Sequence, residues 1–156
     1  MDIKKHITAL GFVPKNGTNG IYHKIYVDYA IEIDFETQSI NYGSAITAES
    51  KTTQNFSQPE NFVVLECVDR LLTKGYKPQN IVLEKTWPSG HRTPGRLDIC
   101  VNREDGTPYM LIECKTFGKE YDKELARIRK DGGQLFTYFQ LSGSKADVLM
   151  LYASEL

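Results

Sequence analysis

The sequence has few cysteines and no long apolar run, and each absence excludes a class of protein. Its 156 residues include three cysteines, and neither the odd number nor their spacing fits a disulfide framework or a paired zinc-binding motif. We expect Cys67, Cys100 and Cys114 to be reduced core residues. No run of about 18 apolar residues is present, and the first residues lack the apolar core of a signal peptide. We therefore expect a cytoplasmic protein without a membrane partner.

Charge of neither sign is in excess. Lys and Arg number 19, Asp and Glu number 20, and the net charge is −1. No global positive field therefore attracts nucleic acid, and any site for a polyanion must be local. The sequence also contains no GxxxxGK[ST] phosphate-binding loop and no recognisable methyltransferase motif, so ATP-driven or methyl-transfer chemistry would have to lie outside these residues.

The length predicts one globular unit with an N-terminal extension over residues 1–56. Apolar residues recur at helical spacing over 3–10, which predicts a short helix. Over 20–42 they alternate with polar residues, which predicts two or three antiparallel strands with one solvated face. The polar stretch 44–58 then connects this meander to the rest of the chain.

Residues 57–156 predict a helix, three strands, a helix and a strand. Ser57-Gln58-Pro59-Glu60 has the pattern of a capping box, in which the Ser57 side chain and the Glu60 carboxylate bond each other's backbone N–H groups. The elements expected after it are a helix at about 57–74, strands at 81–84, 96–101, 109–115 and 148–152, and a helix over 120–141 that is loosened at Gly132-Gly133. This order predicts an α/β (α+β) fold with an αβββαβ core around a mixed sheet.

The strands at 96–101 and 109–115 carry the most informative residues. Because strand side chains alternate, Glu113 and Lys115 share one face. Antiparallel pairing through the short hairpin brings Asp98 within reach of Glu113. Two converging carboxylates suit Mg²⁺, and a neighbouring lysine could orient or deprotonate an attacking water. A Glu-x-Lys pattern on a strand is, on its own, usually a solvated face.

Residues on the two helices add to this pattern in a fixed order. Glu66 lies on the first helix, and Gln134 and Tyr138 are four residues apart on the second, so they project from one face. A helical glutamate, a strand aspartate, Glu-x-Lys after a hairpin and a helical Gln-x-x-x-Tyr resemble the PD-(D/E)xK nuclease superfamily. The likeness is in particular to the N-terminal nuclease domains of type I restriction enzyme R subunits and of related fused restriction–modification proteins. It covers about residues 57–153, although Leu97 stands where the family loosely keeps a proline.

The resemblance implies a metal-dependent DNA endonuclease domain of a restriction–modification system, which hydrolyses phosphodiester bonds with Mg²⁺ or, alternatively, Mn²⁺. Asp98, Glu113 and the backbone carbonyl of Cys114 would ligate the metal. Glu66 would complete or support the metal shell, and Lys115 would lie near the nucleophilic water. Double-stranded DNA would be the substrate, and motor, methyltransferase or specificity domains or subunits would be the partners.

A loop without acidic residues precedes the aspartate strand, and it could neutralise backbone phosphates beside the carboxylates. A solvated loop has the same composition. By the resemblance, Gln134 and Tyr138 would also aid DNA contact or active-site positioning. The residues expected to contact DNA are therefore Lys85, His91, Arg92, Arg96, Gln134 and Tyr138.

Two hypotheses from other functional classes stay open. In the first, the same residues form a catalytically silent nuclease-like module that binds DNA or docks an adjacent domain. In the second, the chain is an interaction domain that never meets nucleic acid, and it would then show no salt-sensitive association with DNA.

Overall fold

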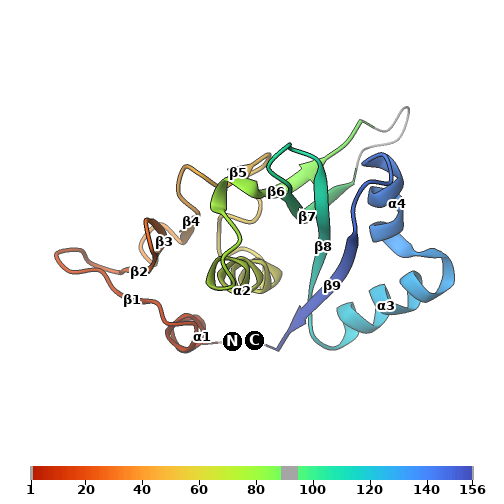
Figure 1. Ribbon diagram of the computed structural model, residues 1–156. Coiled ribbons are helices and arrows are strands. Elements are labelled where there is room, and N and C mark those ends of the chain that lie inside the picture. The colour runs from red at the N-terminus through yellow and green to blue at the C-terminus, as the bar shows by residue number, and fades with distance from the viewer. Residues whose placement is uncertain (1, 89–94, 156) are drawn as a thin grey trace.

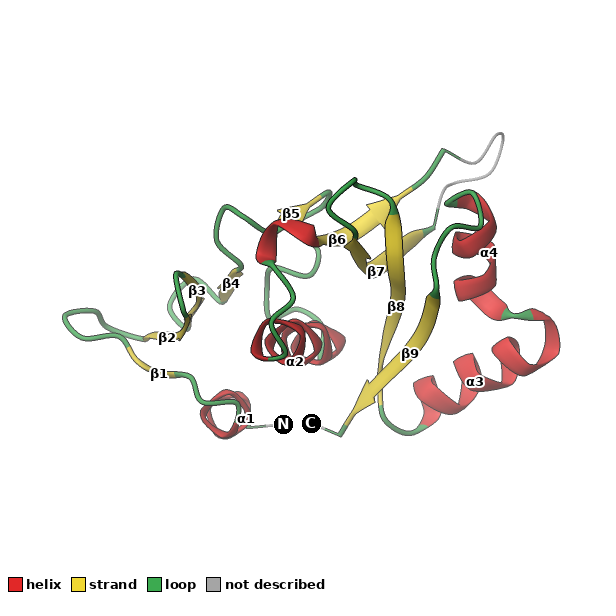
Figure 2. Ribbon diagram, in the orientation of Figure 1, coloured by secondary structure: helices red, strands yellow, loops and turns green. Residues whose placement is uncertain are grey.

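The computed structural model describes residues 2–88 and 95–155, which form two sheets flanked by helices (Figure 1). One sheet is antiparallel with strand order β1-β2-β3-β4, and the other is mixed with order β5-β6-β7-β8-β9. Helix α2 lies between the two sheets, and α3 and α4 cover the opposite face of the mixed sheet (Figure 2). The elements are α1 (Ile3–Ala9), β1 (Val13–Pro14), β2 (Ile21–Tyr26), β3 (Tyr29–Asp34), β4 (Ser39–Asn41), β5 (Thr47–Ala48), α2 (Glu60–Thr73), a 3-10 turn (Pro78–Asn80), β6 (Ile81–Thr86), β7 (Arg96–Asn102), β8 (Pro108–Thr116), α3 (Lys119–Asp131), α4 (Gly133–Leu141) and β9 (Val148–Ser154).

The predicted α+β class and the αβββαβ order of the core are confirmed. The sheet is mixed because β6-β7 and β7-β8 pair antiparallel, whereas β8-β9 and β5-β6 pair parallel. The N-terminal meander is also present, with β2 and β3 paired from Ile21↔Asp34 to Tyr26↔Tyr29. The sequence does not predict two of the strands. Val13–Pro14 forms β1, the edge strand of the first sheet, and Thr47–Ala48 lies in the polar connection and forms β5, the edge strand of the second sheet.

The predicted capping box does not form. Helix α2 begins at Glu60, and its N-cap residue Pro59 makes no side-chain capping bond. The Ser57 backbone N–H instead donates to Asn55 Oδ1 at 2.9 Å, which holds Ser57 in a turn. The Glu60 carboxylate turns away from the helix end and contacts Lys115. The chain therefore uses Glu60 for a tertiary contact in place of a local one.

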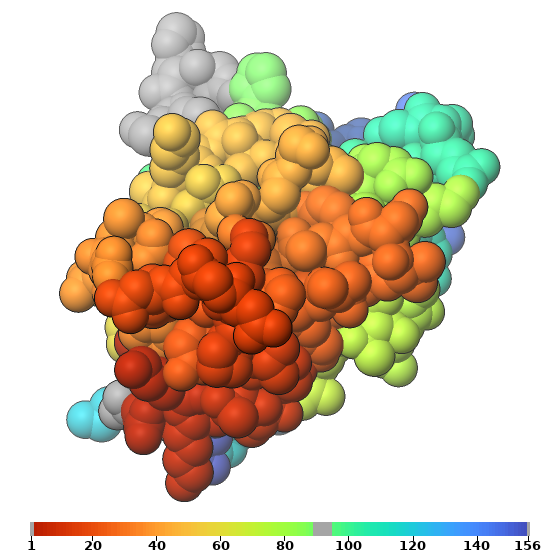
Figure 3. Space-filling model, turned by 90° about the vertical axis from the view of Figure 1, so that its left-hand side faces the viewer, coloured from red at the N-terminus to blue at the C-terminus, as the bar shows by residue number. Residues whose placement is uncertain are grey.

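Two apolar clusters hold the layers together. The larger joins the inner face of the meander to α2 and to one face of the mixed sheet, and it includes Ile31, Ile33, Phe62, Leu65 and Ile99. The N-terminal residues, red to orange in Figure 3, cover this side of the molecule. The smaller lies under α4 and contains Val82, Leu97, Cys100, Leu111, Leu135 and Tyr138. Full burial of each large apolar side chain contributes about 1.5–3 kcal/mol to folding. All three cysteines are free and buried, as predicted.

The helix predicted over 120–141 is two helices. Gly132 ends α3 in the left-handed region, with φ 85°, and its N–H donates to the Ile128 carbonyl. Helix α4 then starts at Gly133 in a new direction. Among the described residues no helix combines the length and the apolar character that crossing a bilayer requires.

Candidate active site

The β7-β8 hairpin brings the predicted strand residues together. The ladder pairs Ile99 with Ile112, so its continuation sets Asp98 across from Glu113. The backbone N–H of Cys114 donates to Asp98 Oδ2 at 2.6 Å. The aspartate of one strand is therefore tied directly to the Glu-x-Lys segment of the next, at the end of the hairpin that is far from its turn.

Lys115 links this segment to the start of α2. Its Nζ lies 2.9 Å from Glu113 Oε1, 3.2 Å from Glu60 Oε1 and 2.9 Å from the Cys114 carbonyl oxygen. Glu113 is 3% exposed, whereas Lys115 and Glu60 are half-buried. One ammonium group therefore bridges a strand carboxylate and a helix carboxylate.

The carboxylates and the ammonium group shift one another's protonation. Burial raises the pKa of Asp98 well above its ordinary value, and the nearby Glu113 carboxylate raises it further. Burial also raises the pKa of Glu113, although Lys115 offsets part of that effect. For Lys115, burial alone would lower the pKa, but the Glu113 and Asp98 carboxylates outweigh burial and raise it. The site therefore keeps Lys115 protonated and disfavours two ionised carboxylates at once.

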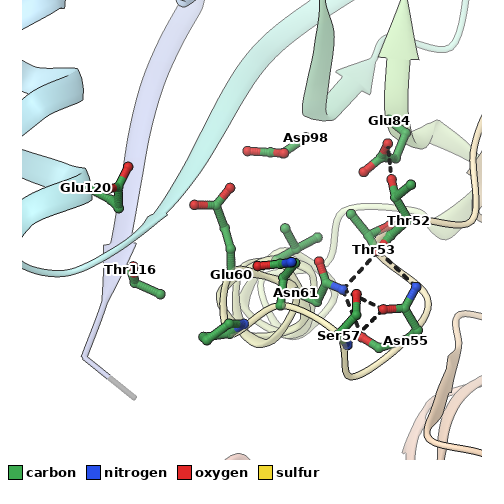
Figure 4. Close-up of a pocket in the computed structure, with 13 residues that line it drawn as sticks. Thr52, Thr53, Asn55, Ser57, Glu60, Asn61, Glu84, Asp98, Thr116 and Glu120 are labelled. Atoms are coloured by element: carbon green, nitrogen blue, oxygen red, sulfur yellow. Dashed lines mark hydrogen bonds between the residues drawn. The ribbon is translucent and has the colours of Figure 1, made fainter.

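A cavity of about 670 Å³ opens beside these residues. Four carboxyl side chains line it, from Glu60, Glu84, Asp98 and Glu120. In Figure 4 the carboxyl groups of Glu60 and Asp98 point toward one another, and Glu84 lies on the neighbouring strand. The rest of the lining is mainly hydroxyl and amide side chains from Thr52, Thr53, Asn55, Ser57, Gln58, Asn61 and Thr116. The cavity is thus polar and acidic, and one of its lining residues, Glu60, forms an ion pair with Lys115.

Glu66, predicted to complete or support the metal shell, does not line this cavity and has contacts of its own. Arg70 Nη2 and the Tyr152 hydroxyl donate to Glu66 Oε1 at 2.7 and 2.8 Å, and the Ser154 hydroxyl donates to Oε2. The reason is the rotation of α2, because six residues of α-helix separate Glu60 from Glu66 by about 9 Å and by roughly 120° around the axis. The helix glutamate beside Lys115 is Glu60.

Tyr138 packs behind the aspartate strand, and Gln134 does not. The buried Tyr138 hydroxyl donates to the Arg96 carbonyl at 3.0 Å, and its ring lies 5.9 Å from that of Trp87. Burial raises its pKa, and the Glu113 and Asp98 carboxylates add to the rise. The exposed Gln134 side chain instead lines a separate pocket with Arg127 and Lys130. The structure therefore brings one member of the predicted pair to the site.

The cations predicted to contact DNA are engaged with acids where the structure describes them. Lys85 Nζ lies 2.6 Å from Glu49 Oε1. Arg96 Nη1 lies 3.4 Å from Glu84 Oε2 and donates to Ser50 Oγ at 2.9 Å. His91 and Arg92 fall outside the described residues.

Comparison with known families gives the chain its relatives. Residues 59–145, more than half of the chain, match the family described as type I restriction enzyme R protein N terminus. The chain belongs to this family. The match runs from the residue before α2 to the loop before β9, so it contains the whole hairpin with Asp98, Glu113 and Lys115. No protein among the curated ones matches the chain.

In this member of the R protein family, sequence reasoning misses three buried or half-buried acids. It assigns Glu60 to a helix cap. Glu84 ends the otherwise apolar run Ile81–Leu83, and a charged residue at the end of a buried strand is the available signal. Glu124, 1% exposed, accepts from Arg127 Nη1 at 3.2 Å and from the Gln134 backbone N–H at 3.4 Å, so it bonds the start of α4. In the sequence, Glu124 cannot be told apart from the acidic residues of α3 that are expected to pair with basic residues at the surface.

The residues at the hairpin fit a divalent cation. Within residues 2–88 and 95–155, no three side chains of His, Cys, Asp or Glu are grouped closely enough to hold a metal by themselves. Mg²⁺, however, commonly takes one or two carboxylates and fills its other positions with waters and substrate phosphate. The paired Asp98 and Glu113 carboxylates are such a set, and Glu113 Oε2 is buried with no hydrogen-bond partner in the part of the chain that the structure describes. An unpaired buried carboxylate oxygen is costly, and coordination to a cation would satisfy it.

Proposed function

We propose that this chain is a PD-(D/E)xK nuclease domain that hydrolyses DNA phosphodiester bonds with Mg²⁺ or Mn²⁺. The observation that carries the proposal is the tie between Asp98 and the Glu113-Cys114-Lys115 segment, through the Cys114 N–H and the register of the hairpin. Membership of the restriction enzyme R protein family supports it, because restriction of DNA is nuclease chemistry.

The ligands of the metal are Asp98, Glu113 and the Cys114 carbonyl oxygen. When bound there, the metal supplies Lewis acidity toward a phosphoryl oxygen and toward a water. Burial and mutual repulsion favour the protonated forms of Asp98 and Glu113, whereas a cation held between them would favour the ionised forms. Metal uptake would therefore release protons from this pair.

Lys115 acts as a fixed positive charge. The Glu113 and Asp98 carboxylates raise its pKa and keep the ammonium protonated in the metal-free site, which favours a role as hydrogen-bond donor. Lys115 donates hydrogen bonds to orient the attacking water and to stabilise negative charge that builds on the phosphate. Glu60, 3.2 Å from Lys115 Nζ, holds the ammonium in place from the helix side.

A plasmid-nicking assay tests the proposal. Supercoiled DNA is incubated with the wild-type chain in Mg²⁺ or Mn²⁺, with and without chelator, and with the variants Asp98→Ala and Lys115→Ala. We expect nicking that requires the metal, and a loss of at least about 100-fold in each variant, because each removes a group that acts on the transition state.

The matched control is Lys77→Ala, which removes a lysine paired at the surface with Glu104. It should nick DNA as the wild type does. Retained cleavage in Asp98→Ala or Lys115→Ala, with the control unchanged, would remove the proposed site. Far-UV circular dichroism of each variant shows whether its fold is intact.

A catalytically silent DNA-binding or docking module is the second candidate, and one observation favours it. Lys115 already bonds Glu113, Glu60 and the Cys114 carbonyl, so its ammonium offsets part of the negative charge of the cluster without a metal. Calorimetric titration with Mg²⁺ or Mn²⁺ separates the candidates, since a silent module takes up no metal through Asp98.

A further inference from the structure

Glu84 has an unusual backbone within strand β6 of the mixed sheet. The β6-β7 ladder pairs Leu83 with Ile99 and Lys85 with Leu97, and it is interrupted between these pairs, where Glu84 faces Asp98. Glu84 has φ 56°, in the left-handed region. This conformation is rare for a residue with a long side chain, costs of order 1–3 kcal/mol, and persists only where the surrounding structure enforces it. Such strain inside a buried strand calls for a compensating role.

Strand β7 changes the faces on which its residues pack at Asp98, opposite this interruption. Residues two apart on a regular strand share a face. Here Ile99 packs into the cluster against α2, whereas Leu97 packs into the cluster under α4. The faces of β7 therefore exchange across Asp98, and the conformation of β6 at Glu84 coincides with that exchange.

The Glu84 carboxylate is held from two sides. The residue is 6% exposed, the Thr52 hydroxyl donates to Oε2 at 2.6 Å, and Arg96 Nη1 lies 3.4 Å from the same oxygen. Arg96 stands two residues before Asp98, and the Tyr138 hydroxyl fixes its carbonyl. Glu84 thus connects the loop at Thr52 to the start of the aspartate strand.

These contacts have no part in the ligand set or in the Lys115 bridge. We propose that Glu84 is a positioning residue that fixes the direction of the Asp98 carboxylate toward the cavity, by holding β7 through Arg96 and through the turned backbone, and that it does not itself ligate the metal. This inference rests on the proposed function.

The test compares Mn²⁺ affinity in three Glu84 variants of the full chain, measured by electron paramagnetic resonance of free Mn²⁺. Glu84→Ala loses the side-chain contacts, and we expect affinity to fall about 10-fold or more, as for residues that orient metal ligands. Glu84→Gln keeps the shape and an oxygen that accepts from Thr52, so affinity should return to within about 3-fold of the wild type. A direct ligand would lose as much in Gln as in Ala, because an amide is a poor ligand in place of a carboxylate.

Glu84→Gly is a second variant for the Mn²⁺ affinity test, for use if Glu84→Ala does not fold. Glycine adopts a left-handed φ without strain, so the backbone turn survives while the side chain is lost, and affinity should again fall. The control is Glu49→Ala, which removes a neighbouring carboxylate that bonds Lys85 and Thr86 on β6. It should bind Mn²⁺ as the wild type does.

The outcomes separate this inference from the function beneath it. If the wild type binds Mn²⁺ and the Glu84→Ala and Glu84→Gly variants bind it with the same affinity, the positioning role is overturned and the nuclease proposal stands. Equal losses in Gln and Ala also overturn it, in favour of direct ligation. A wild-type chain that takes up no Mn²⁺ overturns both.

Discussion

Asp98 and Glu113 lie across a strand pair from each other, and both have raised pKa values in the fold because burial disfavours their charged forms. A group whose folded-state pKa is raised contributes no penalty at pH values below its unfolded pKa. As pH rises from there to the folded-state pKa, the unfolded chain loses its proton while the native state keeps it, so the native state loses stability relative to the unfolded chain. The pair should therefore make the protein less stable at neutral and alkaline pH than its core would allow.

We predict that Asp98→Asn is more stable than the wild type at pH 8 and equal to it at pH 4. The amide oxygen introduced at position 98 still accepts the Cys114 N–H, but the side chain carries no charge. Relief of about 1 kcal/mol would raise the thermal midpoint by about 2–4 °C for a chain of this size. Differential scanning calorimetry between pH 4 and pH 8 measures the difference.

The matched control is Asp105→Asn, on the exposed hairpin turn, where bonds from Thr107 lower the carboxyl pKa. The contribution of Asp105 to stability depends on pH in the opposite direction to that of Asp98. The contribution of Asp105 is present above its ordinary pKa and fades as pH falls, so its Asn variant should not gain stability at pH 8. A wild type that is at least as stable as Asp98→Asn at pH 8 would contradict the electrostatic account of the site.

At the level of single residues, the sequence predicts which side chains come together where regular strand geometry alone places them. Asp98, Glu113 and Lys115 come together because side chains alternate along a strand and the β7-β8 pairing, whose register shifts only near the turn, sets Asp98 across from Glu113. Glu66 and Glu60 could not be distinguished in this way. Their places depend on how α2 is rotated against the sheet, and that rotation follows from long-range packing of its apolar face.

At the scale of secondary structure, the break between α3 and α4 depends on a glycine pair. Gly132 has a left-handed φ of 85°, and a Cβ added to it would lie 2.4 Å from Phe136 Cβ. We predict that Gly132→Ala destabilises the fold by about 2 kcal/mol or more, because left-handed strain and a clash with the first side-chain atom of Phe136 add together. Urea unfolding followed by circular dichroism gives the change in the free energy of unfolding.

Gly143→Ala isolates the conformational part of that cost. Gly143 also has a left-handed φ, of 80°, but apart from Gly143 itself and its two chain neighbours, no described residue has an atom within 4 Å of an added Cβ. Its Ala variant should lose about 1 kcal/mol. Equal losses in the two variants would mean that Phe136 does not constrain the break.

Helices and strands with a strong hydrophobic period are predicted within a few residues, and the exceptions have local causes. The double glycine correctly predicts an interruption after α3. Strand β5 has only two residues and no apolar period, and it forms because the exposed edge of β6 offers it hydrogen bonds. The left-handed turn at Glu84 has no sequence pattern at all, since glutamate does not favour that conformation.

At the scale of the whole molecule, the N-terminal meander and the αβββαβ core share one apolar cluster. Four aromatic rings cross from one to the other in edge-to-face contacts, from Tyr22 through Phe35 and Phe56 to Phe62, with centroids 5.1 to 5.4 Å apart. Strand β5 crosses as well, by pairing with β6. The boundary predicted at residue 56 rests on a change in sequence pattern. Hydrophobic periodicity along the chain does not indicate which apolar face of the extension packs on which face of the core.

This shared cluster predicts that the full chain unfolds in one transition and that residues 57–156 alone do not fold stably. Removal of 1–56 exposes the α2 face around Phe62 and leaves the edge of β6 unpaired. In the full chain, urea unfolding followed by Trp87 fluorescence and by far-UV circular dichroism should give coincident curves. The milder variant Phe62→Ala should lower the free energy of unfolding by about 3–5 kcal/mol in both probes alike. Two separated transitions, or a truncated chain with a cooperative transition of its own, would show that the extension and the core are independent folding units.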